Sequence, residues 1–243
     1  MAADSIDVVA SHDGHVRRLT MPGGQLSTAI ARAVVAAAEE LVEQRDVRVV
    51  VLDARTSPFC SGPAEGLDRF DVDPAAALAR LRPPVVCVID GDCHSVGLEL
   101  ALATDIRICS PTASFALPDA TTGQLPAWGG TQRLPRAIRR AEATAMVLTG
   151  STINADRALS LGLVHEVHAD LTAGVDALVN NLVGLGPLAL ELTKEAIHRG
   201  SEMPLRDGLR LEGDLNHQLA ATEDRAEGLQ AFFDKRPPDF SGR

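Results

Sequence analysis

The chain has 243 residues and is 45% hydrophobic, which is enough apolar material for a sizeable core. Its formal net charge of −10 argues against binding the phosphate backbone of nucleic acids, and its 3% aromatic content argues against base-stacking surfaces. No apolar run approaches the roughly 20 residues that span a membrane, and the N-terminus lacks a basic-then-apolar signal pattern. We therefore expect a folded, cytoplasmic protein with no nucleic-acid partner and no membrane span.

The four cysteines are too far apart for a zinc site. None of them forms a CxxC pair, the spacing that structural zinc sites use most often, so we expect no metal. Two of them lie in apolar stretches, where a free thiol packs like a small hydrophobic side chain. We expect all four to be free, because the chain shows no secretion signal.

The first half of the chain alternates predicted strands and helices. Short strands are predicted at residues 5–10 and 16–20, joined across a His-Asp-Gly turn. Ser27 has the side chain of a helix N-cap, and apolar residues recur at helical spacing from there to residue 43. A buried strand at 47–52, a short helix at 74–81 and a fully apolar strand at 85–89 follow.

The second half is mostly helical. The segment GGTQRLPR at 129–136 is predicted to open a helix, and helices are also predicted at 142–149 and 154–161. Asn154 is a good N-cap, Gly162 is a good stop, and residues 162–167 are predicted to form a closing strand. Four helices are then predicted, at 171–185, 187–199, 205–219 and 223–233. This order predicts an α/β core with a helical C-terminal part.

Two acidic residues mark the candidate site. Glu99 is the only charged residue in the apolar segment 97–103, and a buried carboxylate is costly without a partner or a purpose. Asp119 follows 20 residues later on a predicted turn. We hypothesise that the two acids meet over one substrate. The alternatives are that Glu99 is a surface acid paired with an arginine and that Asp119 is an ordinary turn residue.

Six segments together resemble the crotonase superfamily, the enoyl-CoA hydratase/isomerase family, over about residues 47–243. They are PFCSG at 58–62, PPVVCVIDG at 83–91, GLELALATDIRI at 97–108, SFALPD at 114–119, GGTQRLPR at 129–136 and LTGSTINADRALSLGLVHEV at 148–167. The resemblance implies an α/β fold, a crotonase-type spiral of ββα units with a helical C-terminal oligomerisation region. It divides the chain into a core at residues 1–190 with the acyl-CoA site and a helical region at 191–243 that packs subunits into a homotrimer or homohexamer.

The same resemblance implies a substrate class and a set of site residues. The ligand is an acyl-CoA thioester, and no cofactor is needed beyond the coenzyme A of the substrate. Glu99 falls on the first catalytic acid of the hydratase pattern, and Asp119 falls on the second, where hydratases carry Glu. The remaining expected oxyanion-hole and substrate-binding residues are Ser61, Gly62, Pro63, Ala64, Val96, Gly97 and Trp128.

The oxyanion hole departs from the family pattern. One backbone donor falls on Pro63, which has no N–H, and the other falls on Val96, where the family prefers Gly. A shift of the loop that lets the N–H of Ala64 take over is one way to restore the first donor. The resemblance thus predicts an enzyme, a lyase or isomerase, and most directly the hydration of 2-enoyl-CoA in fatty acid metabolism. The alternatives are an acyl-CoA-binding protein with weak or no catalysis, or another enolate reaction such as isomerisation, decarboxylation or thioester hydrolysis.

Overall fold

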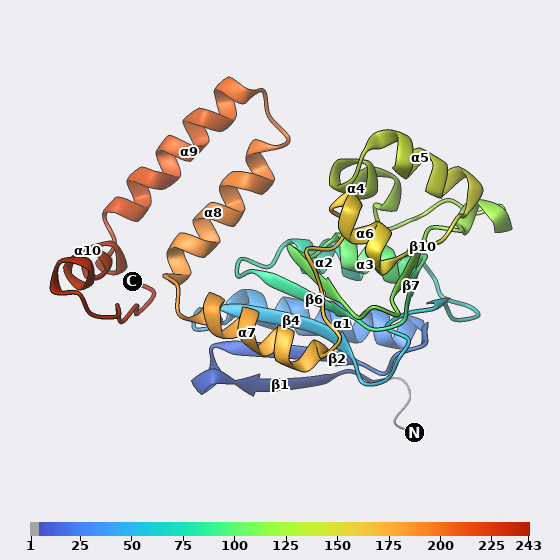
Figure 1. Ribbon diagram of the computed structural model, residues 1–243, viewed down its shortest axis with the longest axis horizontal. Coiled ribbons are helices and arrows are strands. Elements are labelled where there is room, and N and C mark those ends of the chain that lie inside the picture. Colours follow the sequence, from blue (N-terminus) through green and yellow to red (C-terminus); the bar gives the residue numbers. More distant parts are fainter. Residues whose placement is uncertain (1–4) are drawn as a thin grey trace.

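The fold is built on a six-stranded sheet, seen in the computed structural model, which describes residues 5–243 (Figure 1). The strand order is β1-β2-β4-β6-β8-β11, and only β1 runs antiparallel to its neighbour. The strands are β1 (Asp7–Ser11), β2 (Val16–Met21), β4 (Val49–Ala54), β6 (Val85–Ile89), β8 (Ile106–Cys109) and β11 (Glu166–Val167).

Two smaller sheets stand beside the large one and carry the candidate site. In the first, β7 (Asp92–His94) pairs parallel to β9 (Ser114–Ala116), and β10 (Ile153–Asn154) pairs antiparallel to β9. In the second, β3 (Gln25–Leu26) pairs parallel to β5 (Gly62–Pro63). The arrangement is that of a crotonase-type fold, as the sequence predicted.

Helices cover both faces of the large sheet. The helix α1 (Thr28–Glu43) begins at the predicted cap, where Ser27 accepts a hydrogen bond from the Ile30 N–H, and its apolar stripe joins the main core. The helix α7 (Leu171–Val183) covers the other face, where Val175, Val179 and Leu182 pack on valines of β4 and β6. A sheet buried on both sides explains why β6 is apolar at every position and β4 is apolar over its first four residues.

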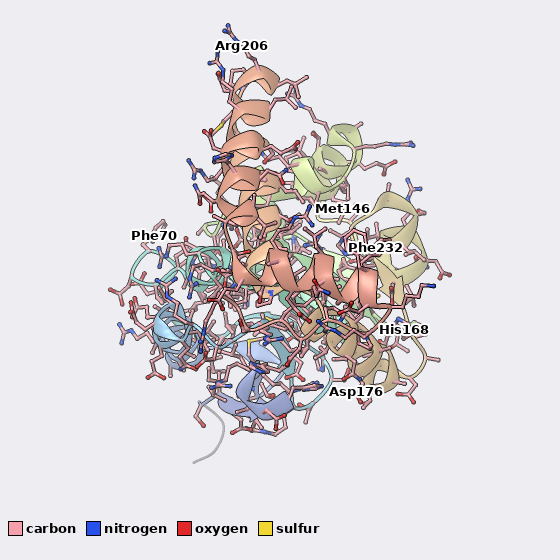
Figure 2. The ribbon with its side chains drawn as sticks, turned by 90° about the vertical axis from the view of Figure 1, so that its left-hand side faces the viewer. Phe70, Met146, His168, Asp176, Arg206 and Phe232 are labelled. Carbon is pink, nitrogen blue, oxygen red and sulfur yellow. The ribbon has the colours of Figure 1, made fainter. Side chains whose placement is uncertain are left out.

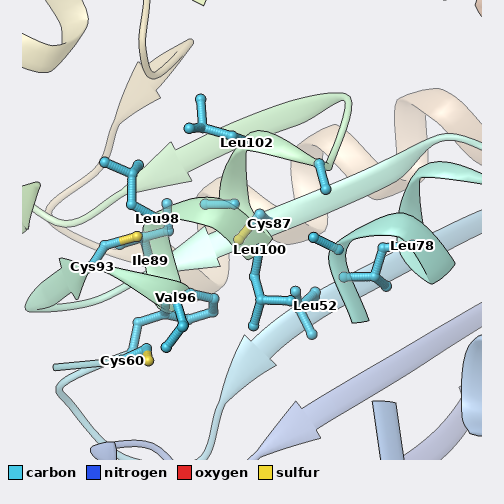
Figure 3. Packing of buried hydrophobic residues seen from close by; sticks show 14 of the residues in the cluster. Leu52, Cys60, Leu78, Cys87, Ile89, Cys93, Val96, Leu98, Leu100 and Leu102 are labelled. Atoms are coloured by element: carbon cyan, nitrogen blue, oxygen red, sulfur yellow. The ribbon is translucent and has the colours of Figure 1, made fainter. Parts of the chain in front are cut away.

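The helix α3 (Val96–Leu102) is buried along its whole length between the large sheet and the helices above it. Figure 3 shows its Val96, Leu98 and Leu100 among side chains of the neighbouring strands, including Leu52 and Ile89. The short helix α2 (Pro74–Ala79) lies beside it, capped by Asp73. Any polar group on α3 is therefore held in a well-packed and water-poor surrounding.

Three further helices lie above α3 in the view of Figure 1: α4 (Gly130–Ala137), α5 (Arg140–Thr149) and α6 (Ala155–Leu161). The predicted cap Asn154 accepts a hydrogen bond from the Arg157 N–H, and Gly162 takes a left-handed φ of 78° at the stop. The strand predicted at 162–167 is shorter than expected and contains only β11. Its first residues instead form a turn, in which the Leu163 and Val164 N–H groups donate back to the Ala158 carbonyl.

The C-terminal helices extend from one side of the body (Figure 1). They are α8 (Pro187–Gly200), α9 (Leu205–Ala220) and α10 (Glu223–Asp234), close to the predicted bounds. They leave large apolar side chains exposed, among them Leu205, Phe232 and Phe233; Figure 2 shows Phe232 on α10. Within residues 5–243 no single helix has the length and apolar character to cross a membrane, and α7 and α8 reach it only as a pair bent by 102°.

Candidate active site

Glu99 is buried in the middle of α3 with a relative exposure of 0%. Its Oε1 accepts two backbone hydrogen bonds of 2.8 Å, from the N–H groups of Trp128 and Gly130. Its Oε2 is buried and has no hydrogen-bond partner within residues 5–243. The carboxylate is thus fixed by one oxygen, and the other is left for a group that the protein does not supply.

Gly130 makes this grip possible because it has no side chain. A Cβ at this position would lie 3.1 Å from both Cγ and Oε1 of Glu99. Gly130 is also the first residue of α4, so its unpaired N–H and the partial positive charge of the helix start face the carboxylate. The GG pair at 129–130 lies at the start of the predicted helix, and the anion that this helix start meets is Glu99.

The surroundings of Glu99 raise its pKa above the ordinary glutamate value. Burial raises the pKa of Glu99, and the nearby charge of Asp119 adds to the rise. Hydrogen bonds from Gly130 and Trp128 favour the ionised form but do not outweigh burial, so the pKa stays above its usual value. A carboxyl group whose pKa is raised in this way is better suited to accept and release a proton than an ordinary surface carboxylate.

Asp119 lies at the first position of the 3₁₀ turn Asp119–Thr122, and its side chain is 0% exposed. Its Oδ1 accepts a 2.5 Å ion-paired hydrogen bond from Arg69 and a 2.8 Å hydrogen bond from the Ser95 hydroxyl. Its Oδ2 is buried and meets no hydrogen-bonding group in the described part of the chain. Both acids therefore present the same pattern, one oxygen held by donors and one left free.

The sequence analysis did not identify Arg69 and Ser95 as site residues. Arg69 lies in the loop after β5 and carries no motif, and its side chain is only 10% exposed in the structure. Its guanidinium also donates to Ser95 Oγ at 3.3 Å, and its carbonyl accepts a 3.0 Å hydrogen bond from the Trp128 indole N–H. The interpretation of Glu99 as an acid paired with an arginine is wrong, because the arginine of this site pairs with Asp119.

Ser95 has a backbone conformation that non-glycine residues seldom adopt. Its φ is 50° and its ψ is −119°, a strained combination that costs on the order of 1–3 kcal/mol. The Ser95 N–H donates to the Ala116 carbonyl at 2.9 Å, which holds this turn against β9. The positive φ marks Ser95 as an unusual residue. It is a property of the folded backbone, however, and cannot be recognised in the sequence.

The two segments predicted to form the oxyanion hole lie side by side. The start of α3 approaches the segment before β5 so closely that a Cβ at Gly97 would lie 2.5 Å from Cys60 Cβ. Pro63 offers no N–H. The Ala64 N–H donates to the Leu26 carbonyl at 2.9 Å, so the expected replacement donor is already used by the β3–β5 pairing. The Val96 N–H has no acceptor within residues 5–243.

The other expected lining residues have mixed roles. Ser61 is exposed, and its N–H donates to the Gly24 carbonyl at 2.9 Å. Gly62 is buried with a φ of 133°, a conformation open to glycine. Trp128 is 1% exposed and touches both halves of the site, through its backbone N–H to Glu99 and its indole to Arg69.

A cavity of 570 Å³ with mostly apolar walls lies beside residues that hold the two acids. Its lining includes Leu67, Arg69, Leu125 and Ala127, and Phe70 stands at its edge with 97% exposure (Figure 2). Glu99 and Asp119 do not line it directly; Arg69 is bonded to Asp119 and Ala127 precedes the Trp128 N–H that holds Glu99. The size and lining suit a small organic ligand.

The histidines, cysteines and acids of residues 5–243 give no support to a metal site, and the cysteines give none to a disulfide. Residues 5–243 contain no group of three or more histidines, cysteines or acids that could hold a metal ion. All four cysteines are buried and free. Burial raises the pKa of the Cys60 thiol to about 11, which keeps it in its unreactive protonated form.

Comparison with known proteins matches the chain to one protein family over most of its length. The family model for enoyl-CoA hydratase/isomerase matches residues 23–243. The chain is 35% identical to a 2,3-dehydroadipyl-CoA hydratase from Escherichia coli K12, covering 98% of this chain and 99% of the relative. It is 37% identical to an (E)-benzylidenesuccinyl-CoA hydratase from Thauera aromatica, covering 81% and 82%. The crystal structure of an enoyl-CoA hydratase from Bacillus anthracis superposes with a TM-score of 0.91 at 31% identity, covering 98% and 100%.

Proposed function

Because the chain belongs to the enoyl-CoA hydratase/isomerase family, we propose that it hydrates the 2,3 double bond of an enoyl-CoA thioester. The observation that carries this proposal is the pair of buried carboxylates, Glu99 and Asp119, each held by one oxygen and free at the other. Two such oxygens are suited to accept the two hydrogens of one water molecule.

The reaction follows from this geometry. The thioester oxygen accepts a hydrogen bond from the unpaired Val96 N–H, which stabilises negative charge as it develops. A water molecule held between Glu99 Oε2 and Asp119 Oδ2 attacks C3, and the electron pair of the double bond moves towards the thioester oxygen. Glu99 accepts the proton that this water loses and delivers it to C2 as the enolate collapses. Water is thereby added across C2 and C3, with no redox change and no cofactor other than the coenzyme A of the substrate.

The division of labour between the acids follows from their partners. Glu99 faces no cation within hydrogen-bond distance and has a raised pKa, caused first by burial, so it is suited to gain and lose a proton in each cycle. Asp119 is bonded to the Arg69 guanidinium, which suits an ionised carboxylate that accepts hydrogen bonds. We therefore assign the proton transfer to Glu99 and the orientation of water to Asp119.

The test is the loss of enoyl absorbance when the protein is mixed with crotonyl-CoA and with a longer 2-enoyl-CoA. We expect Glu99→Gln to lower kcat by about 10²–10⁴-fold, the usual worth of a general acid–base, while binding of a saturated acyl-CoA measured by calorimetry stays unchanged. Asp53→Asn is the matched control, because Asp53 is also held at one oxygen, by Arg18, and free at the other, but lies in the sheet. Equal rates for the wild type and Glu99→Gln would contradict the proposal.

A second candidate function is the binding of acyl-CoA with weak or no turnover. It is favoured by the missing N–H at Pro63 together with the engaged N–H of Ala64, which leave Val96 as the one backbone donor of the predicted pair. Loss of one such donor costs about 10²–10³-fold in kcat where it has been measured. Calorimetric binding of acyl-CoA by a wild type that hydrates none of the enoyl-CoAs would favour this function.

We further propose a role in fatty acid metabolism, a cytoplasmic location, and assembly into a homotrimer or homohexamer through residues 191–243, with residues 1–190 forming the core. The exposed apolar side chains of α9 and α10 support the assembly, since such side chains are usually covered by a partner. Sedimentation analysis of the full chain, compared with a Phe232→Ser/Phe233→Ser variant, tests this. A monomeric wild type would contradict it.

A further inference from the structure

We infer that Arg69 and Ser95 are positioning residues that hold Asp119 by its Oδ1, so that its Oδ2 is presented to the reacting water. This inference rests on the proposed hydration reaction and deepens it. Neither residue needs to touch the substrate in this role; both act through the carboxylate of Asp119.

The contacts form a closed triangle around one oxygen atom. Arg69 donates to Asp119 Oδ1 at 2.5 Å, Ser95 Oγ donates to the same oxygen at 2.8 Å, and the Arg69 guanidinium donates to Ser95 Oγ at 3.3 Å. Because each of these three side chains is hydrogen-bonded to the other two, the carboxylate has little freedom to rotate about its χ angles. Because both donors converge on Oδ1, the unpartnered Oδ2 has a defined direction.

The burial of the triangle shows that it is part of a built site and not a surface ion pair. Asp119 has 0% of its side chain exposed, Arg69 has 10%, and Ser95 as a whole has 4%. Arg69 is fixed from behind as well, because its carbonyl accepts the indole N–H of Trp128. Trp128 in turn donates its backbone N–H to Glu99, so one residue ties the placement of both acids together.

Ser95 is the more informative of the two residues, because its backbone conformation disfavours any residue that has a side chain. A φ of 50° favours glycine, yet the position carries a serine whose hydroxyl is used on Asp119. If only the backbone turn mattered, glycine would serve at least as well. The hydroxyl is therefore the reason for the serine.

The experiment separates the hydroxyl from the backbone by comparing Ser95→Gly with Ser95→Ala. Glycine removes both the hydroxyl and the strain, whereas alanine removes only the hydroxyl. We expect both variants to lose about 10–100-fold in kcat, the scale of a reacting group misplaced by about 1 Å, with KM and the Kd of a saturated acyl-CoA unchanged. A Ser95→Gly variant as active as the wild type would overturn the inference.

Arg69 is tested through its conservative replacement. We expect Arg69→Met to lose kcat strongly and Arg69→Lys to recover part of the loss, because lysine keeps the charge but not the fork of donors. Arg18→Met is the matched control, since the Arg18–Asp53 pair has the same 2.5 Å separation but lies away from α3. Equal kcat for Arg69→Met and Arg69→Lys would overturn the role of the charge.

Failure of the hydration proposal is distinguishable from failure of this inference. If the wild type hydrates no enoyl-CoA, the proposed reaction is wrong, and the positioning is then judged from crystal structures of the wild type and of Ser95→Gly/Arg69→Met. We expect one Asp119 rotamer in the wild type and a different or mixed rotamer in the variant. An unchanged Asp119 rotamer in that variant would overturn the inference regardless of activity.

Discussion

Glu99 and Asp105 are both carboxylates associated with α3, one inside the helix and one just beyond its end, and their surroundings are opposite. Glu99 meets only backbone N–H groups, and its Oε2 has no partner. Asp105 accepts the Val85 N–H at 2.7 Å and lies 2.6 Å from the Lys194 ammonium and 3.0 Å from His198 Nε2. Glu99 therefore lies at the candidate site, whereas Asp105 connects the end of α3 to α8.

The pKa directions follow from this difference. Burial raises the pKa of Glu99, and nothing with a positive charge outweighs it. Burial acts on Asp105 in the same direction, but the hydrogen bond from His198 and the charge and hydrogen bond of Lys194 outweigh it, so its pKa is lowered. The comparison teaches that burial alone does not mark a reactive acid. Asp105, held by Lys194, His198 and the Val85 N–H, is an anchor, whereas Glu99, held by backbone N–H groups, keeps the raised pKa of a candidate for chemistry.

The largest effect is expected at the anchor. Asp105→Ala leaves the Lys194 ammonium buried without its partner and should cost about 3–5 kcal/mol of unfolding free energy in a urea titration. The double variant Asp105→Ala/Lys194→Met should recover part of this loss, because it no longer buries an unpaired charge. The lowered pKa of Asp105 stabilises the fold above the ordinary aspartate value of about 3.9 and ceases to do so as the pH falls below it. A loss no larger than for a surface acid would contradict the anchor role.

For the proposed reaction at Glu99, we expect the rate to be limited by the missing oxyanion donor and not by the two acids. Successive N–H groups of a strand point to opposite edges; since the Ala64 N–H faces β3, an N–H at position 63 would face the other way, and β5 also contacts α3. Pro63→Ala should therefore raise kcat for an enoyl-CoA by about 10²-fold, equivalent to about 2.7 kcal/mol. Pro74→Ala at the start of α2 is the control. An unchanged kcat in Pro63→Ala would show that the hole lies elsewhere.

The smallest effect tests the cost of keeping Glu99 reactive. Because the pKa of Glu99 is raised in the folded state, wild-type stability is lost as the pH rises above the ordinary glutamate value of about 4.3. Glu99→Gln should therefore be more stable than the wild type at pH 8, and this gain should vanish well below pH 4. Unfolding free energies at both pH values measure it. A destabilised Glu99→Gln at pH 8 would mean that its oxygens are better satisfied than they are in this structure.

The sequence by itself determined the elements and the family. Strand β6 has the predicted bounds, and α1, α2 and α6 begin at caps or first residues that the sequence marks, because capping and apolar periodicity are local properties. The spacing of Glu99 and Asp119 was also visible in the sequence, since both sit in motifs shared with a large family. Several predicted bounds differ from the structure: the strand at 162–167 loses its first residues to a glycine turn, the strand at 47–52 lies at Val49–Ala54, and the helix at 74–81 ends at Ala79.

Only the tertiary structure decided how the two acids are held. The partners of Glu99 are backbone N–H groups 29 and 31 positions away, and a backbone group carries no side-chain signature that a sequence could reveal. Arg69 and Ser95 reach Asp119 across 50 and 24 positions, from a loop and from a strained turn. The fate of the Ala64 N–H was likewise set by strand pairing between β3 and β5. Residue types can be read along the chain, but which donor meets which oxygen depends on how distant segments pack.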